Sequence, residues 1–282
     1  MFVKLDTMKL LDGKELAGYI KERQLKQVRA LRQSWRVVPR LAIIQTIDNP
    51  VIDTYVGLKK VYGADILVEV DAYKIDQSGL MSQIETLNAD PTVHGIIIQL
   101  PLADSAQTQD AVDAVTPQKD VDGLGKDATL TPATAMAIDW LLAGYNVGLN
   151  GKQIAIVGNG RLVGAPLAKL WNTQGLKTTV YDSKTPDLTT ELRQADVIVT
   201  ATGQPGLIMR DMVAPGAVLV DAGTAAEHGK IVGDISPEVR ELDDITITPE
   251  KGGVGPLTVC ALFDNVIQSA RRVADAQGQQ DL

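Results

Sequence analysis

The chain has 282 residues, of which 45% are hydrophobic and 22% charged, and its net charge is −8. This length permits two domains with hydrophobic cores, and the composition is that of a globular protein rather than a disordered or membrane-spanning one. The negative charge argues against nucleic acid as a partner, and two histidines with one cysteine, Cys260, argue against a metal site. A lone cysteine, with neither a leader nor a membrane span expected, predicts a cytoplasmic protein.

Short apolar runs alternate with helical patterns along the chain. Most runs are continuous, which is typical of strands covered on both faces, and the alternation with helices predicts parallel sheets in an α/β protein. The predicted strands are Leu41–Thr46, Ile66–Val70, Gly95–Leu100, Gln153–Val157, Thr178–Tyr181, Asp196–Ala201 and Ala217–Asp221, and the predicted helices are Lys14–Leu31, Ile52–Tyr62, Leu80–Asn88, Ala106–Val115, Pro132–Ala143, Val163–Thr173 and Val259–Val273.

The polar stretch Gly123–Thr131 marks the predicted domain boundary, because it precedes a helix that Thr131 can cap and whose first turn Pro132 fits. A second crossing at Gly252–Pro256 would return the last helix to the first domain. We therefore predict a first, α/β domain of residues 1–130 plus 255–282. A second domain of the Rossmann type would comprise residues 131–254.

Three polar groups in the first domain are candidates for chemistry. Tyr55 and Lys59 are four residues apart and so share a helix face, although on spacing alone an amphipathic surface helix is the commoner explanation. A ring can stack on a flat heterocycle, and an amine can transfer a proton if burial lowers its pKa. Gln99 ends an apolar strand, and Asp122 lies in the charged segment Lys119–Gly123. The alternative for Gln99 is a polar strand-end residue that faces solvent, and the alternative for the segment with Asp122 is a charged interdomain loop.

The second domain carries a glycine-rich turn, Gly158–Pro166, between a strand and a helix. Its G-x-G-x-x-x-G spacing is one residue longer than the common dinucleotide fingerprint, so it fits either a pyrophosphate site or a generic turn. Asp182 follows 24 positions after Gly158, where a carboxylate can bind ribose hydroxyls or only shape a turn. Thr200–Pro205 and Asp221–Thr224 follow two further strands and would lie beside a nicotinamide.

Near the end of the chain, three glycines and a proline crowd into Gly252–Thr258, just before the apolar run Val259–Val273. Because glycine has no Cβ, backbone can press close to a ligand or to another strand there. A pocket wall built from main chain and a tight interdomain turn explain the segment equally well.

Taken in order, five segments resemble the methylenetetrahydrofolate dehydrogenase/cyclohydrolase family, and the resemblance extends from Leu11 to Arg272. It implies an enzyme that oxidises 5,10-methylenetetrahydrofolate with NAD or NADP and then hydrolyses the methenyl product to 10-formyltetrahydrofolate. It also implies a homodimer formed through the cofactor domain. The five segments are Tyr55-x-x-x-Lys59, Gln99–Leu102, Lys119–Gly123, Val163–Pro166 and Gly252–Thr258.

The same resemblance implies roles for individual residues. Lys59 would be the key catalytic residue, acting with Gln99 in the hydrolysis, and Asp122 would bind the amino-pyrimidine edge of the pterin. Tyr55 would pack on the folate rings. Gly255, Pro256 and Leu257 would help to wall the folate site. The cofactor would bind at Gly158, Asn159, Gly160, Val163, Gly164, Asp182, Ser183, Thr202, Gly203 and Thr224.

Two departures from the family pattern bear on the cofactor. Asn159 stands where many relatives carry an arginine that could hold a 2′-phosphate, and Asp182 stands where histidine is frequent. A carboxylate repels a 2′-phosphate, so we predict a preference for NAD over NADP, although Arg161 and Lys184 could compensate.

Further departures near Tyr55, among them Ile47 and Ile52, leave the balance of the two activities open. The alternatives are a dehydrogenase with weak cyclohydrolase activity and a dinucleotide-binding protein without catalysis.

Overall fold

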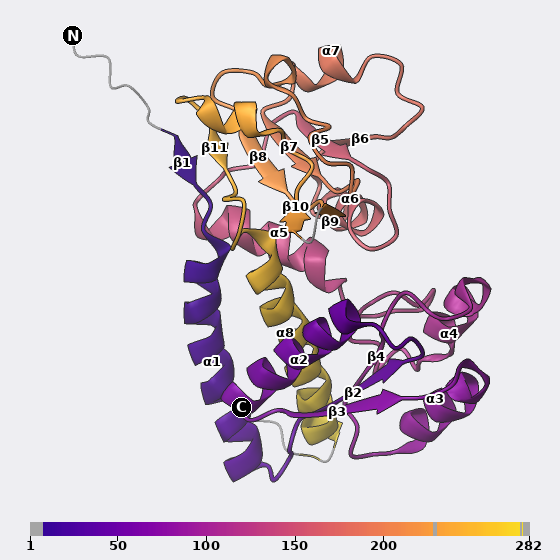
Figure 1. Ribbon diagram of the computed structural model, residues 1–282. Helices are drawn as coiled ribbons and strands as arrows, with labels where there is room; N and C mark the ends of the chain where they lie inside the picture. Colours follow the sequence, from indigo (N-terminus) through magenta and orange to yellow (C-terminus); the bar gives the residue numbers. More distant parts are fainter. Residues whose placement is uncertain (1–7, 228–229, 277, 279–282) are drawn as a thin grey trace. The chain divides into compact units, whose positions relative to one another are not determined.

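The computed structural model describes residues 8–227, 230–276 and 278 (Figure 1). The chain divides into two compact units, neither of which is continuous in sequence. Unit 1 comprises residues up to 17 together with 134–258, and unit 2 comprises residues 18–133 together with those from 259 onward. Each unit has a parallel β-sheet whose strands are connected by helices, so the predicted α/β class is confirmed.

Unit 2 is built on three parallel strands in the order β3-β2-β4. Helices α3 and α4 lie on one face of this sheet, where Ile84 and Val112 pack with Ile96 and Ile98 (Figure 1). Val266 of α8 lies against Gly95, on the other face. The elements are α1 (Gly13–Ser34, beginning in unit 1), β2 (Arg40–Gln45), α2 (Pro50–Asp65), β3 (Glu69–Lys74), α3 (Leu80–Ala89), β4 (Gly95–Ile98), α4 (Thr108–Ala114), the later part of α8 (Val254–Ala276), and 3-10 turns at Gln77–Gly79 and Ser105–Gln107.

Unit 1 is built on six strands in the order β1-β11-β8-β7-β5-β6, all paired in parallel. One face packs Ile198, Leu219 and Ile247 against residues such as Leu192 and Val239. The elements are β1 (Lys9–Leu10), α5 (Ala133–Gly144), β5 (Ile154–Val157), α6 (Gly164–Thr173), β6 (Thr178–Tyr181), α7 (Leu188–Leu192), β7 (Val197–Thr200), β8 (Val218–Asp221), the hairpin β9 (Ala225–Glu227) and β10 (Lys230–Val232), β11 (Thr246–Ile247), and 3-10 turns at Arg210–Met212 and Pro237–Glu241.

Several element boundaries differ from the predicted ones; α2, for example, spans Pro50–Asp65 rather than Ile52–Tyr62. The predicted strand at Ile66–Val70 begins later, at Glu69, because Ile66 caps the end of α2 and Leu67 takes a left-handed φ of 65°. Helix α8 begins at Val254 rather than after Thr258, so the glycine-proline segment forms its first turn, where proline costs no hydrogen bond. Helix α5 begins at Ala133, one residue after the predicted start.

His94 immediately precedes β4, at the amino end of that strand, and is buried next to Lys119. Its side chain is only 5% exposed, and its Nδ1 has no hydrogen-bond partner among the described residues. Burial lowers the pKa of His94 to about 4, and the nearby Lys119 ammonium lowers it further. The imidazole is therefore neutral in the folded protein at neutral pH.

We expect His94 to make the fold acid-sensitive. Because its folded pKa lies below the unfolded value of about 6.5, the unfolded chain binds the extra proton and stability falls as the pH drops from 6.5 towards 4. Between pH 7.5 and pH 5 the loss should be about 2 kcal/mol. Urea titrations of the wild type and His94→Gln at both pH values should show a smaller loss for the variant. Equal losses in the two proteins would contradict this role.

Candidate functional site

The predicted site residues fall into two groups, one in each unit. Lys59, Gln99 and Asp122 belong to unit 2, and the glycine turn at Gly158 belongs to unit 1. Each group is built from residues that are distant in sequence and brought together by its own sheet.

Lys59 is held on α2, a helix with a defined start. The side chain of Asn49 accepts a hydrogen bond from the Val51 N–H at 2.8 Å, and Pro50 occupies the first helical position, as N-terminal signals require. Two turns later, the Lys59 Nζ donates to the Gln99 Oε1 at 3.0 Å. Burial lowers the pKa of Lys59, and the carboxylate of Asp122 opposes this shift only in part. The lowered pKa favours the neutral form of the Lys59 amine more than in an exposed lysine.

Gln99 follows the last residue of β4 and is fixed at both ends. Its main-chain N–H extends the sheet by donating to Ile44 O at 2.8 Å, and its side-chain Nε2 donates to Leu100 O at 3.2 Å. With the Nε2 used in this way, the Oε1 is turned towards Lys59. The amide therefore orients the amine without competing for its lone pair.

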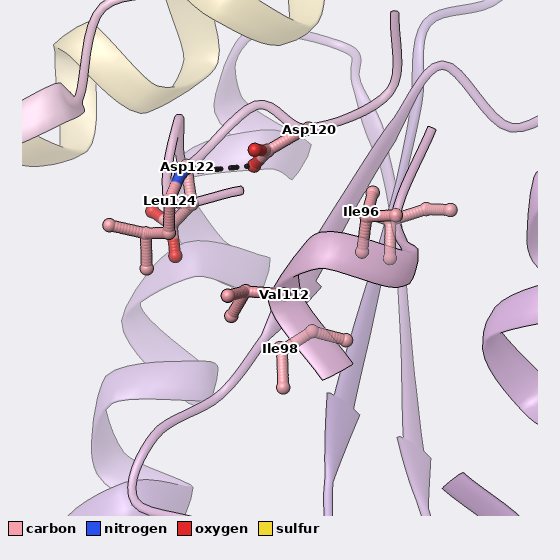
Figure 2. Close-up of a pocket in the computed structure, with 7 residues that line it drawn as sticks. Ile96, Ile98, Val112, Asp120, Asp122 and Leu124 are labelled. Atoms are coloured by element: carbon pink, nitrogen blue, oxygen red, sulfur yellow. Dashed lines mark hydrogen bonds between the residues drawn. The ribbon is translucent and has the colours of Figure 1, made fainter. Parts of the chain in front are cut away.

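Asp122 lies in a loop that two neighbouring residues hold in place. The Lys119 Nζ donates to three main-chain carbonyls at the end of α3, those of Leu87, Asn88 and Asp90, at 2.6–2.9 Å. The Asp120 carboxylate accepts main-chain N–H groups from Gly123 and Gly125 at 2.9 and 2.8 Å, and also that of Asp122 (Figure 2). Sequence reasoning assigned neither residue a role, because both act through hydrogen bonds that their spacing does not reveal.

Burial raises the pKa of Asp122 to about 6, an effect that the Lys59 ammonium opposes and the Asp120 carboxylate strengthens. The group is still mostly ionised at neutral pH, and so it can accept hydrogen bonds from a flat pair of donors. Beneath the loop is a hollow of about 10 Å³ lined by Ile96, Ile98 and Val112 (Figure 2). That is room for about one water molecule and far too little for a folate.

Tyr55 lies one helical turn before Lys59, and its side chain is 41% exposed, which leaves the ring available for stacking. The other predicted substrate residues begin α8 in unit 1. Of these, Gly255 is exposed, Pro256 is half-buried and Leu257 is fully buried in the core. Leu257 can therefore act on a ligand only through packing.

In unit 1 the strand register gathers the predicted cofactor residues at one sheet edge. Val157, Tyr181, Thr200 and Asp221 are the last residues of four adjacent strands and form one row of register partners. The residues that follow them therefore lie together outside the carboxyl ends of the strands, where α/β sheets bind ligands. This row brings together Gly158–Gly160, Asp182–Ser183, Thr202–Gly203 and Thr224, while Val163 and Gly164 follow at the start of α6.

The glycine turn is shaped by close backbone packing. A Cβ on Gly164 would lie 1.8 Å from the Gly158 carbonyl oxygen, and a Cβ on Gly158, whose φ is 105°, would lie 2.7 Å from the Ala201 oxygen. A Cβ on Gly160, in contrast, would meet no atom within 4 Å. Packing therefore explains why Gly158 and Gly164 are glycines. Gly160 instead leaves open space in front of the start of α6, which fits the approach of a pyrophosphate.

Asp182 and Thr202–Gly203 shape the loops beside this turn. The Asp182 carboxylate accepts the Lys184 N–H at 2.8 Å, so it does organise a turn, but a carboxylate has capacity left for ribose hydroxyls. Gly203 has a φ of 67°, and its Cβ position lies 3.4 Å from the Thr224 oxygen. The loops after β7 and β8 are therefore in contact.

In the described ranges 8–227, 230–276 and 278, no group of three or more His, Cys, Asp or Glu side chains is arranged to hold a metal ion. Within the same ranges, no helix combines the length and apolar character needed to cross a membrane.

Comparisons with known proteins agree with both halves of the site. Residues 11–122 match the family model described as "Tetrahydrofolate dehydrogenase/cyclohydrolase, catalytic domain", and residues 132–274 match its "NAD(P)-binding domain". The chain is 38% identical to the "Bifunctional protein FolD" of Campylobacter jejuni over 279 residues, which is 94% of this chain and 99% of the relative. It is 35% identical to the protein of that name from Staphylococcus epidermidis, over 92% of this chain and 95% of the relative.

Solved structures give the same picture. The crystal structure of the bifunctional FolD enzyme from Campylobacter jejuni superposes with a TM-score of 0.88 at 36% identity, covering 94% of this chain and 99% of that one. The enzyme from Trypanosoma brucei, solved with NADP and an inhibitor, gives a TM-score of 0.87 at 29% identity, with 94% and 98% covered. With both family models matched along its length, this chain belongs to the tetrahydrofolate dehydrogenase/cyclohydrolase family.

Proposed function

We propose that this chain oxidises 5,10-methylenetetrahydrofolate to 5,10-methenyltetrahydrofolate with NAD(P) and hydrolyses the product to 10-formyltetrahydrofolate. The observation that carries the proposal is the 3.0 Å hydrogen bond from Lys59 to Gln99, next to the half-buried Asp122. Family membership supports the reaction class, and this cluster supplies a lysine with a lowered pKa where a base is needed.

In the hydrolysis, Lys59 would act as the base. The methenyl substrate carries a positive charge, so water that adds to its cationic carbon must lose a proton. A neutral Lys59 amine can accept that proton, while its own N–H donates to the fixed Gln99 Oε1. A neutral amine also avoids repulsion with the cationic substrate.

Folate would bind mainly to unit 2. Asp122 offers two acceptor oxygens to the amino-pyrimidine edge of the pterin, and the exposed Tyr55 ring offers a flat stacking surface. Gly255, Pro256 and Leu257 would wall the site from the start of α8. We assign substrate binding to residues 1–130 plus 255–282 and cofactor binding to residues 131–254. These ranges differ from the two compact units, because residues 8–17 and 255–258 belong to unit 1.

For the cofactor, we propose that NAD is preferred over NADP. When bound, the nicotinamide accepts the hydride of the oxidation. Asp182 stands at the end of β6, at the sheet edge that also carries the glycine turn, and Asn159 supplies no positive charge to hold a 2′-phosphate. Like-charge repulsion from Asp182 would then penalise NADP.

The wild-type protein tests both proposals in one assay. With 5,10-methylenetetrahydrofolate and either NAD or NADP, we expect cofactor reduction with little accumulation of methenyl product, and a kcat/KM for NAD roughly tenfold above that for NADP. Accumulating methenyl product would indicate a dehydrogenase with weak cyclohydrolase activity, and no reduction with either cofactor would overturn the function.

The variant Asp182→Asn should narrow the preference between cofactors, because it removes the charge and keeps the shape. Asp187→Asn is the matched control, since Asp187 only caps α7 and asparagine caps equally well. A clear NADP preference in the wild type, or identical ratios in Asp182→Asn and wild type, would contradict the role of Asp182.

We further propose a cytoplasmic homodimer that associates through the cofactor domain. The family resemblance supports the dimer, and the single, buried cysteine, Cys260, supports a reducing compartment. Light scattering of the purified protein measures its molar mass in solution and so tests the dimer directly.

A further inference from the structure

A pair of buried carboxyl groups, Asp221 and Asp234, lies at the carboxyl edge of the unit 1 sheet. Asp234 has no role assigned above, and Asp221 was named only as the first residue of the segment Asp221–Thr224. Asp234 is fully buried on the segment that follows β10. Its Oδ2 accepts the Thr200 hydroxyl at 2.6 Å and the Thr202 main-chain N–H at 2.7 Å. One carboxylate oxygen thus holds the residues that end β7 and begin the loop Thr202–Gly203.

Asp221 connects Asp234 to the next strand. The Asp221 Oδ1 accepts the N–H groups of Gly223 and Asp234, and its Oδ2 accepts that of Ile235, all at 3.1 Å. Arg240 approaches the Oδ2 at 3.8 Å. The two carboxylates therefore join the end of β7, the end of β8 and the segment after β10 through hydrogen bonds that no sheet ladder provides.

Glycines make room for both groups. A Cβ on Gly223 would lie 2.1 Å from the Asp234 carboxyl carbon, and a Cβ on Gly233 would lie 2.1 Å from the Asp221 Oδ2. The carboxylates thus fit only because two opposing positions lack a side chain. This complementary packing indicates that the two carboxyl groups and the two glycines form one specific arrangement.

The hydrogen-bonding capacity of the Asp234 carboxyl group is only partly satisfied within the fold. Its second oxygen, Oδ1, is buried and has no hydrogen-bond partner among the described residues, and leaving a buried polar atom unpaired costs free energy. A buried polar atom without a partner is rare in native structures and calls for an explanation, of which a role at a functional site is one. The two hydrogen bonds that Asp234 accepts come from the last residue of β7 and from the loop that follows it.

That loop supports the glycine turn. The Gly158 main chain packs directly on the Ala201 carbonyl, one residue before Thr202, so the position of Thr202 fixes the surface beneath the turn. Gly203 in turn meets the Thr224 carbonyl. Moving Thr202 would therefore displace three of the segments to which cofactor binding is assigned.

We propose that Asp234 is a positioning residue of the dehydrogenase reaction, which holds the Thr200–Gly203 segment in the geometry that the nicotinamide half of the cofactor requires. The proposal rests on the function proposed above and makes Asp234 specific to one of the two activities. The hydrolysis needs no nicotinamide, so it should be indifferent to Asp234.

The test compares both activities in Asp234→Ala, Asp234→Asn and the exposed control Asp243→Ala. In Asp234→Ala we expect the dehydrogenase kcat/KM for NAD to fall about 100-fold, chiefly through KM, since a displacement of about 1 Å can cost that much. Cyclohydrolase turnover should stay within about twofold of wild type. Asp234→Asn should recover most of the loss, because its amide oxygen can accept both hydrogen bonds.

Undiminished NAD turnover in Asp234→Ala, or equal loss of both activities, would overturn the proposal. So would an Asn variant as impaired as the Ala variant. If Asp234→Ala does not fold, Thr200→Val removes one of the two bonds and should raise the KM for NAD several-fold, while an unchanged KM would count against the role. The Kd for NADH is also measured for the wild type and each variant. If the wild type binds NADH without turnover, the proposed function is refuted, and the role of Asp234 is then judged by whether Asp234→Ala weakens NADH binding.

Discussion

Lys59→Met is expected to abolish cyclohydrolase activity while the fold and cofactor binding survive. Methionine keeps the length and the apolar stem of lysine, so α2 and its packing should be unaffected. What is lost is the amine that donates to Gln99 and can take a proton from water. General-base catalysis contributes about 10²–10⁴-fold, so a loss of about 10³-fold is expected.

The rate of methenyl disappearance, corrected for the buffer reaction, measures this loss. Lys60→Met is the matched control, because Lys60 is the next residue of the same helix and is exposed. In the wild type, turnover should fall as the pH drops through the lowered pKa of Lys59, since protonation removes the base. Normal cyclohydrolase turnover in Lys59→Met would contradict the assignment of Lys59 as the base.

Gly164→Ala is expected to disable the dehydrogenase selectively. The new methyl group would lie 1.8 Å from the Gly158 carbonyl oxygen, a main-chain atom that cannot swing aside as a side chain would. The turn and the start of α6 must then separate. Because catalytic geometry tolerates little displacement, we expect dehydrogenase kcat/KM to fall about 100-fold or more. Unit 2 holds Lys59, Gln99 and Asp122, so the cyclohydrolase should remain.

Two other glycine substitutions sharpen this prediction. Gly148→Ala lies in unit 1 with no atom within 4 Å of the new methyl group, and it should change neither activity. Gly160→Ala also meets no protein atom, so any rise in its KM for NAD would report contact with the cofactor itself. A Gly164→Ala enzyme with wild-type NAD kinetics would show that the close approach is not needed for function.

Much of the fold could be predicted because its signals are local. The buried strands β5, β7 and β8 are continuous apolar runs, and each was placed to within about two residues, as is usual for element ends. Four strands were not predicted. The hairpin strands β9 and β10 are three residues long, and β1 and β11 are two residues long and exist only because they pair with each other and with β8. The turn at Leu67 was also not predictable, because leucine rarely takes a positive φ and is therefore not a residue that marks turns.

The site was predictable to a different extent. Lys59 and Gln99 are 40 residues apart, and no periodicity joins them, so the resemblance to a family was needed to pair them before the 3.0 Å hydrogen bond was known. Lys119 and Asp120 were noted only as part of the segment Lys119–Gly123, without roles of their own, and Asp234 was missed altogether. Each acts through main-chain groups of distant segments, and a sequence does not show which carbonyl or N–H a side chain will reach.

The division of the chain also constrains how the protein can be made. The sheet of unit 1 needs β11, at residues 246–247, to join β1 to the rest, and unit 2 needs Val266 against Gly95 and the Asn265 side chain on the Val121 carbonyl. During synthesis on the ribosome, the sheet of unit 1 cannot be completed before residue 247 has emerged, and the core of unit 2 cannot be completed before residue 266. Both units therefore complete folding late and nearly together, rather than in the order in which their first strands are translated.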